Sequence, residues 1–93
     1  MSTVHAAIGN SDDKLSQRDW SSYLEDFHLV MVTAATQVHG VWHSAPVSQF
    51  QNACIAAEVA PEALDGLRAA LLSLRRRHRQ ESVAFNVSET ELV

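Results

Sequence analysis

Alternation of apolar and polar residues with a period of two is the feature that most restricts how this chain can fold. Such alternation is typical of β-strands with one face buried and the other face exposed. Four segments show it, and each has the length of an ordinary strand. The four segments are TVHAAIG at 3–9, TQVHGVWH at 36–43, NACIAAEV at 52–59 and ESVAFNV at 81–87.

Two further segments carry apolar residues at the three- and four-residue spacing of a helix. The segment 61–79 begins at Pro61, which suits a first helical position, and ends in arginines that favour the negative end of a helix dipole. The segment 16–27 begins at Ser16, a residue that caps helices, and its pattern allows an end near residue 27 or near residue 35. The two apolar stripes contain Trp20, Tyr23, Leu24 and Phe27, and Leu64, Leu67, Leu71, Leu74 and His78.

The order strand, helix, strand, strand, helix, strand predicts an α+β protein with the ferredoxin-like βαββαβ pattern. Right-handed crossovers place both helices on one face of a four-stranded antiparallel sheet. We expect one domain over 1–93, with loosely ordered ends at 1–2 and 88–93 and a connection at 44–49. The alternative is an all-helical hairpin with a long helix over 20–38. The β-branched and aromatic residues of 83–87 and the glycine at position 40 argue against it.

The composition excludes several classes of protein. The 93 residues have a formal net charge of −4, which argues against binding to nucleic acid. A single cysteine, Cys54, excludes an internal disulfide. No apolar segment has the length of a membrane helix or the form of a signal peptide, so we expect a cytoplasmic protein without membrane contact.

Strict alternation divides the strand residues between two faces. Val38 and Trp42 share the apolar phase of the second segment and are expected beneath the helices, whereas Val41 falls on the far face. Alanines at positions 7, 56 and 84 fall on the same far face, where a solvated sheet normally carries larger polar residues. We therefore expect a second copy to cover this face, which makes a homodimer. The candidate ligand or interface residues there are His5, His39, His43, Cys54, Glu58 and Asn86.

The spacing of the histidines argues against a metal site. His39 and His43 would lie about 6 Å apart on a helix but about 13 Å apart on a strand, too far to share one zinc ion. We expect no metal and no cofactor. Cys54 is expected to act as a small, half-buried apolar residue rather than as a nucleophile. The basic run 75–79 has a structural explanation at the end of its helix.

Three short motifs resemble a family of small bacterial domains of unknown function with the same alternation of elements. The motifs are Asp19-Trp20 at the start of the first helix, Gly40-x-Trp42 in the second strand, and Gln80-Glu81-Ser82-Val83 after the second helix. The resemblance covers most of the chain. It implies the ferredoxin-like fold, and it implies no activity.

Two functions are compatible with these patterns. The first is a non-catalytic binding or regulatory module that recognises a partner protein or a small ligand through the open sheet face. The second is a cofactor-independent enzyme of the dimeric α/β-barrel kind, a monooxygenase or isomerase, with His5, His39 or His43 as general base. A solvent-open pocket with a histidine pointing inward would favour the enzyme, and a flat or filled far face would favour the module.

Overall fold

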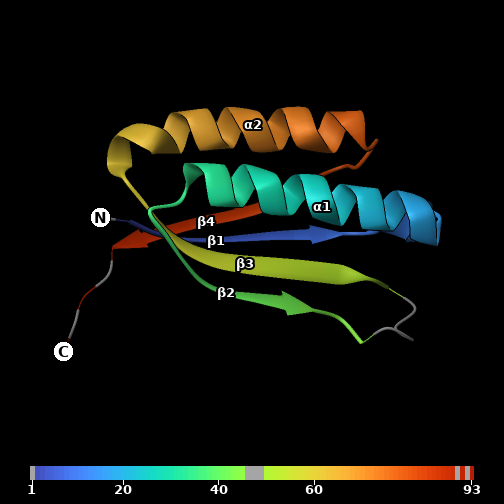
Figure 1. Ribbon diagram of the computed structural model, residues 1–93. Helices are drawn as coiled ribbons and strands as arrows, with labels where there is room; N and C mark the ends of the chain where they lie inside the picture. The colour runs from blue at the N-terminus through green and yellow to red at the C-terminus, as the bar shows by residue number, and fades with distance from the viewer. Residues whose placement is uncertain (1, 46–49, 90, 92) are drawn as a thin grey trace.

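The fold contains four strands and two long helices in the expected order (Figure 1). The computed structural model describes residues 2–45, 50–89, 91 and 93. Short 3-10 turns precede both helices, at Ser11–Asp13 and at Pro61–Ala63. The remaining elements are β1 (Ser2–Gly9), α1 (Gln17–Ala34), β2 (Gln37–His43), β3 (Asn52–Val59), α2 (Leu64–Arg77) and β4 (Ala84–Glu89).

The strands form one antiparallel sheet in the order β2-β3-β1-β4, and both helices lie on one face of it (Figure 1). This is the ferredoxin-like arrangement that the sequence predicted, and it excludes the all-helical alternative. The ends of the sheet extend further than expected, because Ser2 pairs with both Val59 and Glu89. Of the expected connection 44–49, residues 46–49 lie outside the described part of the chain, as do residues 1, 90 and 92.

The core lies between the sheet and the two helices. The hydroxyl oxygen of Ser16 accepts a hydrogen bond of 3.2 Å from the backbone N–H of Asp19, which caps α1 as expected. The helix continues to Ala34, the longer of the two possibilities. Both helical stripes face the sheet, where their side chains meet those of the two central strands. The core residues include Val4, Ala6, Trp20, Tyr23, Phe27, Met31, Ile55, Ala57, Leu67, Leu71 and Leu74.

An aromatic contact and a hydrogen bond join the two helices. The ring of Tyr23 in α1 stacks on His78 at the end of α2, with 4.7 Å between the ring centres. His78 Nε2 also lies 2.8 Å from Asp26 Oδ2. The Tyr23 hydroxyl is fully buried and has no hydrogen-bond partner among the described residues. Burial raises the pKa of Tyr23 to about 12, although the charge of Arg75 acts in the opposite direction.

We expect Tyr23→Phe to raise the free energy of unfolding by about 1 kcal/mol at neutral pH, because it removes a buried hydroxyl without a partner. Above about pH 10 the unfolded phenol ionises while the folded phenol stays neutral up to about pH 12. The wild type therefore loses about 2–3 kcal/mol over this interval, and Tyr23→Phe does not. Urea unfolding of both proteins across this pH range measures the difference. A parallel pH dependence in the two proteins would contradict the assignment.

Candidate functional site

The face of the sheet opposite the helices, called the open face below, carries five of the six candidate residues. The strand register places His5 of β1 directly opposite Ala56 of β3 and Asn86 of β4. Cys54 and Glu58 lie on the same face of β3, two residues before and two residues after Ala56. They are therefore diagonal neighbours of His5, a relation that corresponds to about 7–8 Å in an antiparallel sheet.

Glu58 is held tightly at one end of the open face. It is 9% exposed and is the one charged residue among the buried residues that the structure describes. The Thr3 hydroxyl donates to its Oε1 atom at 2.7 Å, and His39 Nε2 lies 3.1 Å from the same oxygen. Side chains from β1, β2 and β3 thus meet at one carboxylate. The contact gives Glu58 and His39 a structural role in joining three strands.

β2 contains one residue more than its partner strand requires. Val38 pairs with Ala57, but Gly40, two residues further on, pairs with Ala56, the very next residue of β3. His39 is the extra residue. A β-bulge of this kind shifts the alternation by one position, so every side chain beyond it changes face.

The bulge makes three predicted orientations in β2 wrong. Trp42 was expected beneath the helices, and it pairs with Cys54 on the open face. His43 was expected on the open face, and it pairs with the core residue Ala53 on the helix side. Val41 moves to the helix side in the same way. The predicted alternation is confirmed before the bulge, since Val38 packs against the core and His39 reaches Glu58 on the open face.

The indole ring of Trp42 lies against Gly40 on the open face. A Cβ atom added to Gly40 would lie 3.1 Å from Cη2 and 3.4 Å from Cζ2 of that ring. Glycine therefore leaves the space that the ring occupies. Ala56, the cross-strand partner of Gly40, is only 4% exposed, whereas Trp42 is 56% exposed. Trp42 is thus the one large apolar side chain among the described residues of a face built mainly from small ones.

We expect Gly40→Ala to displace the indole ring of Trp42, because the new methyl group would lie 3.1 Å from it. The ring is half-exposed and free to shift, so the free energy of unfolding should change by at most about 1 kcal/mol. The NMR signal of the Trp42 indole N–H should move, and that of Trp20 should not. Gly66→Ala is the control, since a Cβ at this exposed position of α2 meets nothing within 4 Å. The free energy of unfolding of the control should rise by about 1 kcal/mol. An unmoved Trp42 signal, or equal movement of the Trp20 and Trp42 signals, would contradict the contact.

The bulge also directs His43 into a pocket between α1 and β2, called the α1–β2 pocket below. The pocket has a volume of about 270 Å³ and is open to solvent. Its polar groups are Glu25 and His28 from the exposed side of α1 and His43 from β2. The apolar lining residues are Leu24, Phe27, Val41, Ala53 and Ile55.

The α1–β2 pocket combines apolar walls with groups that can donate, accept or transfer a proton. Imidazole side chains change charge near neutral pH, and a carboxylate can accept a hydrogen bond from a ligand. Glu25 and His28 were not among the predicted site residues, because on an amphipathic helix their pattern is that of ordinary solvent-facing residues. Their position next to the apolar stripe residues Leu24 and Phe27 was the available signal.

The described part of the chain lacks both a metal-binding cluster and a membrane-spanning helix. No group of three or more His, Cys, Asp or Glu side chains there is arranged to hold a metal ion. No helix there has the length and apolarity needed to cross a membrane. Cys54 is a free, half-buried thiol on the open face.

Comparisons with known proteins identify the fold and no family. No protein-family model matches the sequence, and no curated protein matches it at a significant level. Similar solved structures exist, with sequence identities of 12–14%. At such identities the likeness establishes the fold alone.

A Deinococcus radiodurans protein described as "a putative antibiotic biosynthesis monooxygenase" has a TM-score of 0.61 and 13% identity, over 100% of this chain and 95% of its own. A dimeric ferredoxin-like protein of unknown function from Thermobifida fusca YX has a TM-score of 0.59 and 12% identity, over 97% and 92%. A hypothetical Arabidopsis thaliana protein has a TM-score of 0.54 and 14% identity, over 98% and 89%. The resemblance to small ferredoxin-like domains is thereby confirmed.

Proposed function

We propose that this protein binds a small, mainly apolar molecule in the α1–β2 pocket, and that His28 and His43 form hydrogen bonds to its polar group. The observation that carries the proposal is the orientation of His43, which the β-bulge turns from the open face into the pocket. Bulges commonly re-aim side chains beside functional sites. Apolar walls with a few converging polar groups are typical of ligand pockets.

The size of the pocket restricts the ligand. Its volume of about 270 Å³ lies just below the range of about 300–1,000 Å³ that is common for drug-sized ligands. A molecule of about one ring fits this space. Because the chain is acidic and Glu25 lies at the pocket, a neutral ligand is favoured over an anion.

Catalysis is the second candidate function, and the same histidine favours it. An imidazole that faces a bound ligand can act as a general base. The Deinococcus radiodurans protein, whose description is quoted above, gives this candidate support by analogy of fold only. In this candidate His43 removes a proton from a carbon atom of the ligand and returns it at the end of the cycle.

NMR titration with neutral single-ring alcohols and ketones tests both candidates. We expect saturable shifts at Leu24, Phe27 and Val41, and about fivefold weaker binding in His43→Ala, since a lost hydrogen bond is worth about 1 kcal/mol. His5→Ala, the same change on the open face, is the matched control and should bind normally. Shifts centred elsewhere, or equal losses in the two variants, would contradict the proposal. If His43 removes a proton from ligand carbon, ligand C–H signals should disappear in deuterated water. Such a loss that does not occur in His43→Gln would support the catalytic candidate.

We further propose that the open face binds a second copy of this chain, as the sequence analysis expected. Trp42 lies on this face with about half of its surface exposed. The rest of the face carries small residues and a hydrogen-bonded Glu58, and no lysine or arginine among its described residues. Two such faces can pack together without placing like charges opposite each other. The Thermobifida fusca protein, described as dimeric, gives further support.

Light scattering after size-exclusion chromatography tests this assembly. The chain mass is 10.2 kDa, and the wild type should elute with twice that mass. Trp42→Glu should elute as a monomer, because it places two carboxylates in the apolar interface. Leu29→Glu is the matched control, since Leu29 is 67% exposed on α1, on the other side of the molecule. A monomeric wild type, or dissociation by Leu29→Glu, would contradict the proposed interface.

A further inference from the structure

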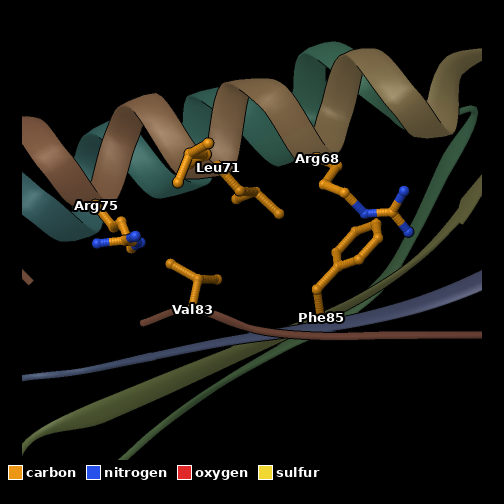
Figure 2. Close-up of a pocket in the computed structure, with 6 residues that line it drawn as sticks. Arg68, Leu71, Arg75, Val83 and Phe85 are labelled. Carbon is orange, nitrogen blue, oxygen red and sulfur yellow. The ribbon is translucent and has the colours of Figure 1, made fainter. Parts of the chain in front are cut away.

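A second pocket opens at the other edge of the sheet, between α2 and β4 (Figure 2). This α2–β4 pocket has a volume of about 270 Å³ and shares no lining residue with the α1–β2 pocket. An inference about it is therefore independent of the function proposed above. The lining residues are Arg68, Leu71, Leu72, Arg75, Val83 and Phe85.

One end of the α2–β4 pocket is closed by an arginine whose charge is already engaged. The guanidinium carbon of Arg68 lies 5.2 Å from the centre of the Phe85 ring, a cation–π contact (Figure 2). The Nη1 atom of Arg68 also lies 3.6 Å from a carboxylate oxygen of Asp65. The cation–π contact places the guanidinium beside the aromatic ring, and the exposed Asp65 carboxylate lies near its charge.

The other end carries an arginine without a balancing carboxylate. Arg75 is half-buried, and its Nη1 atom donates a hydrogen bond of 3.1 Å to the backbone oxygen of Gln80. Among the described residues no salt bridge joins Arg75 to a carboxylate, in contrast to Arg68 and Arg77. A guanidinium has five N–H donors, so Arg75 retains donors after bonding to one carbonyl.

The walls between the two arginines are apolar. Leu71 is 3% exposed and forms part of the core, and Val83 and Phe85 pack against the core from the β4 side. Figure 2 shows Leu71 between the two arginines, facing Val83 and Phe85. A half-buried cation next to apolar walls lacks part of its hydration. An anion with an apolar body can form hydrogen bonds to the cation and pack its apolar part against the walls.

The distribution of charge supports an anionic ligand in this part of the molecule. The whole chain has a net charge of −4, but five of its seven Lys and Arg residues lie between positions 68 and 79. The basic surface is therefore local to α2 and the residues after it. Arg68 and Arg75 are separated by two turns of helix, about 10 Å, so a single small anion contacts one of them. The unbalanced Arg75 is the better partner.

We infer that the α2–β4 pocket binds a small ionised carboxylic acid. The carboxylate receives hydrogen bonds from Arg75, and the apolar part of the molecule packs against Leu71, Val83 and Phe85. Arg68 limits the far end of the site. A carboxylate fits this setting better than a phosphate, because the planar fork of arginine matches two carboxylate oxygens. A phosphate dianion is more strongly hydrated, and the apolar walls offer no hydrogen-bond donors to replace its water.

NMR titration of the full chain with phenylacetate, phenylacetamide and phenyl phosphate tests this inference. The three probes carry the same ring and differ in the polar group. We expect shifts around Val83, Phe85 and the second half of α2, and we expect phenylacetate to bind about tenfold more tightly than phenylacetamide. Equal binding of these two probes, or tighter binding of phenyl phosphate, would overturn the carboxylate assignment.

Variants of α2 assign the effect to one side chain. Arg75→Gln should reduce the preference for phenylacetate over phenylacetamide to about one. Arg76→Gln, the same change on the exposed neighbouring residue, is the matched control and should leave the preference unchanged. Because Arg75 also bonds to Gln80, thermal unfolding of each variant is measured in parallel.

If Arg75→Gln does not fold, Arg75→Lys replaces it. We then expect the preference for phenylacetate to fall several-fold, because the planar fork is lost. An unchanged preference in the Arg75 variant, or an equal loss in Arg76→Gln, would overturn the inference.

Discussion

The register of β2 against β3 depends on one extra residue, and that register decides which side chains can act together. His39 occupies the bulge and turns back to Glu58, which is also bonded to Thr3 of β1. Beyond the bulge, Trp42 lies on the open face and His43 lies on the helix side, at the α1–β2 pocket. Without the extra residue the two would exchange places. The open face would then lose its large apolar residue, and the α1–β2 pocket would lose its histidine.

The fold was predictable because its signals are repeated along the chain. Four alternating segments and two helical stripes give the order of elements. Ser16 caps α1, and Pro61 begins the 3-10 turn that leads into α2. Side-chain orientation beyond residue 39 was not predictable, because Gly40 between Val38 and Trp42 fits an unbroken strand as well as a bulged one. The cation–π contact of Arg68 with Phe85 joins segments far apart in sequence, so no local pattern could indicate it.

Both proposed ligand pockets follow from incomplete coverage of the edge strands by the helices. In the central strands β1 and β3, Val4 and Ala57 face the helices and are fully buried. In the edge strands, Val41 of β2 is 36% exposed and Val87 of β4 is 38% exposed on the same side of the sheet. The space between each helix and its edge strand therefore stays open. The exposed flank of each helix supplies polar groups to its pocket, which are Glu25 and His28 on α1 and the arginines on α2.

Nuclear Overhauser spectroscopy of the folded protein measures the orientation of β2 most directly. The account predicts contacts from the His43 ring to the side chains of Leu24 and Phe27, and contacts from the Trp42 indole to the α-protons of Gly40. Contacts from Trp42 to the side chain of Phe27, with His43 close to Cys54, would show that β2 runs without a bulge and would contradict the account.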